Sequence, residues 1–166
     1  MKTNHIKYYS LLFLVFFTFS NFCKIKDKEA KEIDCVMLLV NAKTKKSIKI
    51  CDKIIADRVE FYLGVAKSID RENQERGEQP WVVITYDGLV IEMQDDFIKS
   101  ITITNKKWKL NAFTIGSTLE QIAAKHERIE SKYKNDLHYK IKDSKGILFA
   151  EVDPDKKVNK IGVVFH

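Results

Sequence analysis

The stretch IGSTLEQIAAKHERI, Ile115–Ile129, carries the clearest helix signal in the chain. Ser117 occupies the expected N-cap position, and Glu120 follows three residues later, at the spacing of a capping box. Apolar residues then recur every three or four positions, as on one face of a helix. The face expected to be buried comprises Leu119, Ile122, Ala123, His126 and Ile129. The pattern therefore predicts a capped amphipathic helix.

A fainter copy of this pattern lies sixty residues upstream, in IADRVEFYLGVAKSI, Ile55–Ile69. Asp57 stands at the N-cap position of this stretch, and Glu60 again follows three residues later. Its expected buried face comprises Val59, Tyr62, Leu63, Ala66 and Ile69. The echo predicts two helices built to the same plan.

Strand patterns follow the upstream helix, after a polar loop expected over residues 71–80. The segment WVVITYDGLVIEM, Trp81–Met93, predicts two strands joined by a tight turn at Asp87 and Gly88. A further turn at Asp95-Asp96 precedes a third strand, FIKSITI. The alternation predicts Ile101 and Ile103 facing the core, Thr102 and Thr104 facing outward, and Ile98 at the turn.

The downstream half repeats this order. Its helix precedes three strand-like segments, LHYKI, ILFAEV and VNKIGVVF, separated by the turns DSKG and DPDKK. The matched positions are Ile55/Ile115, Asp57/Ser117, Val59/Leu119, Glu60/Glu120, Gly88/Gly146, Ile101/Ile161 and Ile103/Val163. A three-stranded meander with one helix is marginally stable alone, whereas two copies can bury their apolar faces together.

The sequence therefore predicts an α+β fold, in which two helix-plus-antiparallel-meander repeats pack as one domain, preceded by a β-hairpin. The hairpin spans residues 33–51, the first repeat residues 52–105 and the second repeat residues 106–166.

Residues 1–22 are typical of an export signal. A basic start precedes the apolar run Leu11–Phe19, which is shorter than the roughly 20 residues of a membrane span. An uncleaved N-terminal anchor is the alternative. Cleavage could follow Ser20, or Cys23 could become a lipidated first residue, because SNFC resembles a bacterial lipobox apart from its Phe. Residues 23–32 are charged and predict a tether. The expected location is the periplasm, or the outer membrane or cell surface as a lipoprotein.

The chain has three cysteines, Cys23, Cys35 and Cys51. Lipidation of Cys23 would leave an even number in an exported protein. CVMLLV and SIKIC predict a hairpin whose turn centres on Lys43, and this turn places Cys35 opposite Cys51, within disulfide range. We therefore expect a Cys35–Cys51 disulfide, with two free buried thiols as the alternative.

The duplicated order of elements resembles the beta-lactamase-inhibitor-protein-like fold. The helix start Ile115-Gly116-Ser117, with Glu120, is also similar to the start of the repeat in small bacterial outer-membrane lipoproteins, and DGL followed by FIKSITI fits the same style. The resemblance covers residues 50–165. It implies a sheet that offers a concave face to another protein.

Motifs for chemistry are absent from the sequence: it has no nucleophile motif, no zinc-hydrolase motif and no phosphate loop. His126 falls on an apolar helix face, which favours packing over catalysis. The acid pairs Asp95/Asp96 and Asp153/Asp155 fall in turns, and calcium needs about 6–8 oxygen ligands. We expect no catalytic residue, no metal and no cofactor.

The formal net charge is +6, but no arginine-rich run accompanies it, so nucleic acid is not expected as a partner. Candidate partner-binding residues stand at element boundaries or on the outward sheet face: Trp81, Tyr86, Thr102, Thr104, Trp108, His138 and Lys140. For the aromatic residues among them, a place in the core is the alternative. The leading hypothesis is an exported, non-catalytic protein that binds another protein of the cell envelope or acts as an envelope scaffold. The alternative is a periplasmic inhibitor or immunity protein that blocks an enzyme or toxin, and an enzyme ranks third.

Overall fold

The computed structural model describes residues 37–72, 81–131 and 136–165. The predicted export signal, the tether, Cys23, Cys35 and most of the predicted polar loop lie outside these described residues. The strands are β1 (Leu38–Asn41), β2 (Ser47–Lys49), β3 (Ser68–Glu72), β4 (Trp81–Tyr86), β5 (Leu89–Gln94), β6 (Phe97–Ile103), β7 (Trp108–Leu110), β8 (Glu127–Ile129), β9 (Asp136–Lys140), β10 (Gly146–Val152) and β11 (Val158–Phe165), and the helices are α2 (Ala56–Leu63) and α3 (Leu119–Ala123). The fold is therefore mixed and dominated by sheet.

Eight strands form one antiparallel sheet in the order β3-β4-β5-β6-β11-β10-β9-β8. The four strands after α2 pair in chain order, and so do the four strands after α3. β6 and β11 join the two groups at the centre of the sheet. Each helix is thus followed by four strands rather than the predicted three. The additional strands, β3 and β8, contain Ile69 and Ile129, which the helical spacing assigns to the helices.

β1 and β2 form the predicted hairpin, with Leu39 opposite Ile48. A turn centred on Lys43 would instead place Leu38 opposite Ile48, so the observed register is shifted by one residue. The side-chain oxygen of Asn41 accepts hydrogen bonds from the backbone amides of Lys43 and Thr44, at 3.0 and 3.1 Å. The loop between the two strands, residues 42–46, falls within the predicted turn NAKTKK.

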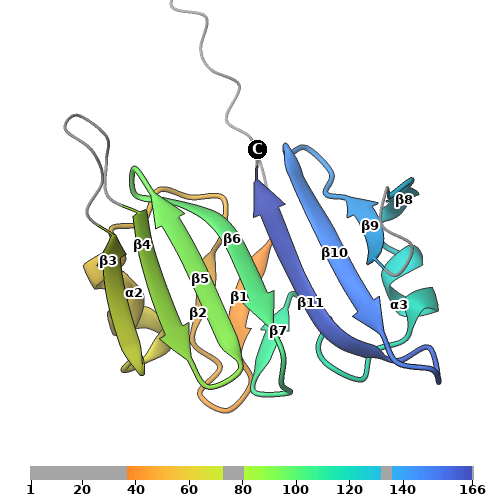
Figure 1. Ribbon diagram of the computed structural model, residues 1–166, viewed down its shortest axis with the longest axis horizontal. Helices are drawn as coiled ribbons and strands as arrows, with labels where there is room; N and C mark the ends of the chain where they lie inside the picture. The colour runs from red at the N-terminus through yellow and green to blue at the C-terminus, as the bar shows by residue number, and fades with distance from the viewer. Residues whose placement is uncertain (1–36, 73–80, 132–135, 166) are drawn as a thin grey trace, which may run out of the picture. The chain divides into compact units, whose positions relative to one another are not determined.

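β7 pairs with the other side of β1, which makes a second sheet in the order β2-β1-β7. Figure 1 shows α2, this small sheet and α3 behind the large sheet. Side chains from this rear layer and from the large sheet form one hydrophobic cluster, in which Leu39, Val59, Ile91 and Ile122 are fully buried. The core therefore lies against only one face of the large sheet.

The predicted cap of the upstream helix is wrong. α2 begins after Ile55, which makes no side-chain capping bond, and Asp57 lies inside the first turn. Glu60 accepts a hydrogen bond from the amide of Ala66, beyond the helix, at 2.7 Å. The helix ends before Gly64, whose φ of 99° departs from helical backbone. Of the predicted stripe, Val59 and Leu63 are buried, Tyr62 is 41% exposed, and Ala66 and Ile69 lie beyond the helix.

α3 is also shorter than predicted, and its N-cap is Thr118 rather than Ser117. The Thr118 hydroxyl accepts from the Gln121 amide, and the Gln121 side chain accepts from the Thr118 amide, so the capping box begins one residue later. The Ser117 hydroxyl instead accepts from the amide of Thr114 at 3.0 Å. Of the predicted stripe, Ile122 is buried, Leu119 and His126 are half-buried, Ala123 is exposed, and Ile129 lies in β8.

The strand and turn predictions fare better. Tyr86 pairs with Leu89 across the predicted Asp87-Gly88 turn, where Gly88 has a φ of 73°. The turn at Asp95-Asp96 also joins two strands, and both residues have positive φ. The three strands predicted in the downstream half correspond to β9, β10 and β11.

Two register shifts interrupt the large sheet at similar places. One lies in β5 between Glu92 and Met93, so that Met93 faces Ile98 and Glu92 faces Ser100. Ile98 is therefore buried inside β6 beside Ile101, and its predicted place at the turn is wrong. The second shift lies in β10 between Glu151 and Val152. The extra residue in β6 lets Ile98 and Ile101, three positions apart, both face the core.

Candidate functional site

The front face of the large sheet, which we call the open face, has no described helix or strand in front of it (Figure 1). Its side chains alternate with the buried ones, and the pairing registers place them in two rows that cross all eight strands. The first row runs Ser68, Thr85, Val90, Thr102, Gly162, Phe149, His138 and Ile129. The second runs Asp70, Val83, Glu92, Ser100, Val164, Ile147, Lys140 and Glu127.

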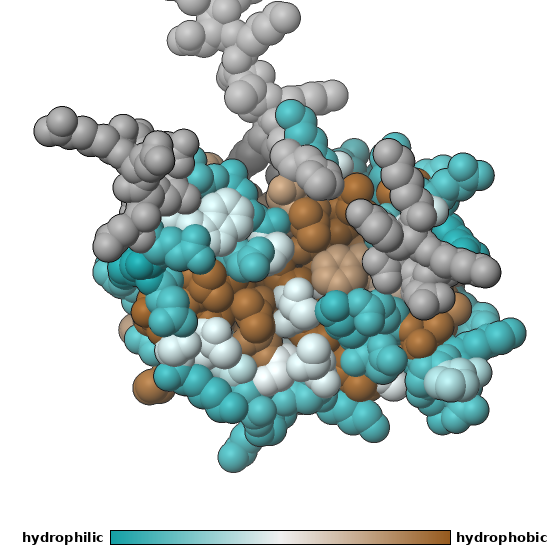
Figure 2. Space-filling model, in the orientation of Figure 1, coloured by the Kyte–Doolittle hydropathy of each residue, from teal (hydrophilic) through white to brown (hydrophobic). Residues whose placement is uncertain are grey.

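The middle of the open face is apolar. Figure 2 shows hydrophobic residues gathered there, with hydrophilic residues towards the rim. The contributing side chains are half-buried, and they are Val83, Val90, Ile147, Phe149 and Val164. An uncovered apolar area rimmed by polar groups is typical of a protein-binding surface.

Two glutamates of the open face bond across to the neighbouring strand. The Ser100 hydroxyl donates to the Glu92 carboxylate at 2.6 Å. The Lys160 ammonium donates to the Glu151 carboxylate at 2.7 Å and lies 5.9 Å from the centroid of the Phe149 ring. These contacts hold polar groups beside the apolar centre.

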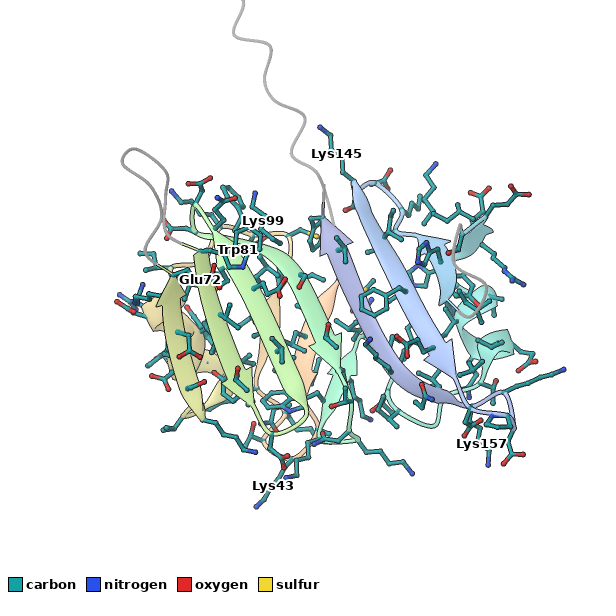
Figure 3. All side chains as sticks on the ribbon, viewed as in Figure 1. Lys43, Glu72, Trp81, Lys99, Lys145 and Lys157 are labelled. Carbon is teal, nitrogen blue, oxygen red and sulfur yellow. The ribbon has the colours of Figure 1, made fainter. Side chains whose placement is uncertain are left out.

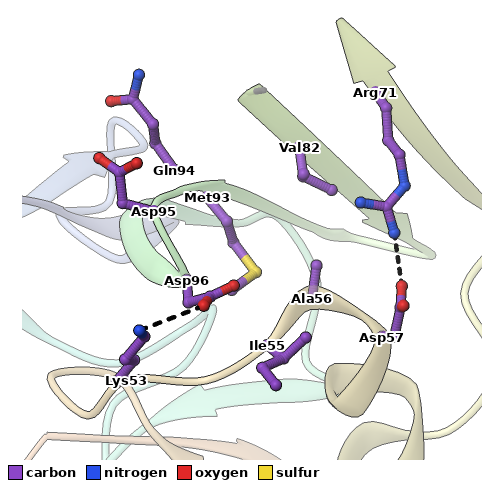
Figure 4. Close-up of a pocket in the computed structure, with 10 residues that line it drawn as sticks. All are labelled: Lys53, Ile55, Ala56, Asp57, Arg71, Val82, Met93, Gln94, Asp95 and Asp96. Atoms are coloured by element: carbon purple, nitrogen blue, oxygen red, sulfur yellow. Dashed lines mark hydrogen bonds and ion pairs between the residues drawn. The ribbon is translucent and has the colours of Figure 1, made fainter. Parts of the chain in front are cut away.

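A cavity of about 300 Å³ lies between α2 and the edge of the sheet (Figure 4). Lys53 and Asp96 form an ion pair at 3.5 Å on one side of it, and Arg71 and Asp57 form another at 2.5 Å on the opposite side. Each cation that lines the cavity is thus engaged by a carboxylate. Exposed pairs of this kind contribute about 0–1 kcal/mol to stability.

Two of the aromatic candidates lie in the core rather than on a surface. Tyr86 is 6% exposed and Trp108 is 4% exposed, and their ring centroids are 5.2 Å apart. The Trp108 indole N–H donates to the Asp87 carbonyl at 2.9 Å, and the Tyr86 hydroxyl donates to the Gly64 carbonyl at 3.1 Å. Burial, with a smaller effect of the Glu60 charge, raises the pKa of Tyr86 to about 12.

The other candidates lie on or beside the open face. Thr102, His138 and Lys140 belong to its two rows, and Trp81 is half-buried at the start of β4, beside Glu72 of β3 (Figure 3). Thr104 follows β6, and its amide donates to the Gly88 carbonyl. Trp81 alternates with the buried Val82 and lies on the same side of β4 as Val83 and Thr85, so the structure brings four of the seven candidates onto one surface.

Sequence reasoning did not single out the residues at the centre of the open face. Phe149, Val90 and Val164 belong to continuous apolar runs, and such runs do not show which side chains face outward. Phe149 alternates with the buried Leu148 and Ala150, but only the pairing of β10 with its neighbours shows that Phe149 faces outward.

His126 contributes to packing beside α3. Its ring lies 5.6 Å from the ring of Phe113, and its Nδ1 lies 3.3 Å from the carbonyl oxygen of Lys140. Burial lowers the pKa of His126, and the hydrogen bond to the Lys140 carbonyl opposes this shift. The neutral imidazole therefore suits this position.

Three further observations concern the described residues. No group of three or more His, Cys, Asp or Glu side chains there could hold a metal ion. No helix among them has both the length and the apolar composition needed to cross a membrane. Cys51 takes part in a disulfide bond, but Cys35 lies outside the described residues, so the Cys35–Cys51 pairing stays a prediction.

Comparison of the chain with protein-family models, with curated proteins and with solved structures finds no match.

Proposed function

We propose that this chain is an exported, non-catalytic protein that binds another protein of the cell envelope through the open face of its large sheet. The observation that carries the proposal is the half-buried apolar centre formed by Val83, Val90, Ile147, Phe149 and Val164. A soluble sheet normally buries such a set or replaces it with polar residues. The export signal predicted over residues 1–22 supplies the location.

The dimensions of the open face suit a protein partner. Eight strands spaced roughly 4.8 Å apart span about 34 Å, and a strand of five to six residues is about 17–20 Å long. Together they offer on the order of 600 Å², close to the roughly 800 Å² that each partner buries in a standard interface. Rigid paired strands also cost little ordering on binding.

We further propose that the two helix-plus-meander halves are tandem repeats. In the central strand pair, Ile101 faces Val163 and Ile103 faces Ile161. Adding sixty to Ile101 gives Ile161, and subtracting sixty from Val163 gives Ile103. The first pair thus maps onto the second, as expected if a two-fold axis relates the two repeats. Leu89 faces Ile103 and Leu148 faces Val163.

Of the matched positions, this register supports Ile101/Ile161 and Ile103/Val163. The helix matches fall outside it, because the N-caps Ile55 and Thr118 are 63 residues apart rather than 60. The register aligns Leu89 with Leu148, so the match of Gly88 with Gly146 is displaced by one residue.

The register shifts give independent support. Glu92 and Glu151 each immediately precede the irregular step in their strand, and they are equivalent under the alignment of Leu89 with Leu148. Each also bonds to a cross-strand partner, Ser100 or Lys160, and these partners are sixty residues apart. A shared bulge with a shared glutamate favours duplication, and this duplication also supports the resemblance to the beta-lactamase-inhibitor-protein-like fold.

Affinity capture from envelope extracts tests the proposed function. The immobilised bait would be the protein itself, compared with Val90→Glu and Thr102→Arg, which place charge on the open face. Lys43→Glu, in the exposed turn of the small sheet, is the matched control. A specific partner should be retained by the protein and the control and lost with both open-face variants. Retention by all four baits would contradict the proposal.

The identity of the partner separates the two readings of this function. If the captured protein is an enzyme or a toxin, its activity should be assayed with increasing amounts of the chain. Stoichiometric loss of activity assigns the inhibitor or immunity role, and unchanged activity assigns the scaffold role.

A further inference from the structure

We propose that a second site, separate from the open face, binds a small carboxylate with an apolar tail. The site is a cavity of about 250 Å³ at the end of the large sheet where the turn between β5 and β6, the turn before β10 and the end of β11 meet. Its lining comprises Ile50, Cys51, Phe97, Ile98, Lys99, Ser144, Lys145 and Phe165.

The walls of this cavity are mainly apolar. Ile50 and Ile98 close it from the core side, and Phe165 is half-buried beside them. Phe97 is 43% exposed. An apolar cavity of about 150 Å³ can hold benzene. A cavity of about 250 Å³ can therefore take a phenyl ring with a short chain, or a medium-length alkyl chain.

Two lysines supply the charge that selects an anion. Lys99 and Lys145 line the cavity, and Figure 3 shows both at the same end of the large sheet. Neither forms an ion pair with any residue that the structure describes. The cavity in Figure 4 differs in this respect, because both of its cations are paired. Two unneutralised ammonium groups beside an apolar wall match a ligand that has a carboxylate at one end.

The β-bulge and a local hydrogen bond determine the chain positions of Lys99 and Ser144. Lys99 is the extra residue of the bulge, because its neighbours Ile98 and Ser100 pair with successive residues of β5. The Ser144 hydroxyl accepts from the Gly146 amide at 2.9 Å, and its own O–H donates to no described residue. Lys99, Ser144 and Lys145 all belong to the lining, so the cavity offers a bound carboxylate two ammonium groups and one hydroxyl within its walls. Charge-assisted bonds of this kind are the strong ones.

Calorimetric titration with 3-phenylpropanoate tests the proposal, and 3-phenylpropan-1-ol is the uncharged probe of the same shape. The protein should bind the carboxylate saturably and the alcohol at least about tenfold more weakly, because a charged hydrogen bond is worth about 1.5–3 kcal/mol. Octanoate, titrated separately, should bind as well, since the wall contacts are not specific for a ring. Equal affinity for the carboxylate and the alcohol would overturn the proposal.

Variants locate the binding. Lys99→Gln and Lys145→Gln should each weaken 3-phenylpropanoate binding about fivefold or more. Phe97→Ser should weaken the binding of both 3-phenylpropanoate and octanoate. Lys43→Gln and Lys157→Gln remove lysines from the other end of the sheet (Figure 3) and should leave the affinity unchanged. Equal losses in these controls would show a general charge effect and would refute the site. No saturable binding at millimolar ligand would refute it as well.

Discussion

Phe149 lies across Gly162, its cross-strand partner in the open face. A Cβ atom added at Gly162 would overlap the Ile101 carbonyl oxygen on one side and would come within 2.6 Å of Cε1 of Phe149 on the other. The absent side chain thus lets the ring settle onto the sheet. This contact places the Phe149 ring at the apolar centre of the open face.

Gly162→Ala should therefore destabilise the fold. The added methyl group must push β6 from β11, and overpacking of this kind costs about 1–3 kcal/mol. Urea unfolding followed by circular dichroism measures the loss. Thr102→Ala, which removes atoms from the other cross-strand partner, should cost less.

A double variant sharpens the test. Because the Ile101 carbonyl remains in the way, Gly162→Ala should still destabilise a Phe149→Ala background. If Gly162→Ala costs no stability in the Phe149→Ala background, the added methyl group clashes only with the Phe149 ring and not with the Ile101 carbonyl, which contradicts the observed geometry.

Tyr86 should make stability fall at alkaline pH. Its pKa is raised to about 12 in the folded protein, whereas an unperturbed tyrosine has a pKa of about 10. The unfolded chain therefore loses this proton first, so the contribution is complete below pH 10 and is lost as pH rises towards 12. Urea midpoints measured from pH 9 to 11 should fall more steeply for the protein than for Tyr86→Phe.

The exposed Tyr62 supplies the control for this experiment. Tyr62→Phe should leave the steeper alkaline loss unchanged, because that side chain is 41% exposed. If Tyr86→Phe and Tyr62→Phe reduce the fall of the urea midpoint with pH equally, burial of Tyr86 is not the cause of the alkaline loss of stability.

The observed helix caps predict unequal effects at two similar-looking positions. Thr118→Ala removes the capping box of α3 and should cost about 1 kcal/mol. Asp57→Ala removes an exposed ion pair with Arg71 and no cap, so it should cost about 0–1 kcal/mol. Thermal unfolding of the two variants compares these losses in stability. A larger loss for Asp57→Ala than for Thr118→Ala would indicate that Asp57 caps α2, as the sequence predicts.

Local patterns predicted the strands well, because turn chemistry and alternation act over a few residues. Asp87-Gly88 is a strong short-range signal for a hairpin, and Ile101 and Ile103 face the core as their spacing requires. The helices were predicted less well. Gly64 ends α2 within the predicted helix, and an apolar residue such as Ile69 satisfies helix and strand spacing alike.

Features that depend on distant pairing could not be predicted. Trp108 enters the small sheet by pairing with Asn41 of β1, and no local signal connects these two segments. The open face has the same origin, because Val164 and Ser100 become neighbours only when β6 and β11 join. The candidate site was therefore predicted in part, through Trp81, Thr102, His138 and Lys140, while its apolar centre was not.

The most direct test of the central claim is site-specific photo-crosslinking in cells that export the protein. A photoreactive residue would replace Thr102 on the open face or, as the control, the exposed Arg58 on α2 behind the sheet. We predict one discrete adduct with another envelope protein from position 102 and none from position 58. An adduct from position 58 alone, or none from position 102, would contradict the assignment of the open face as the binding surface.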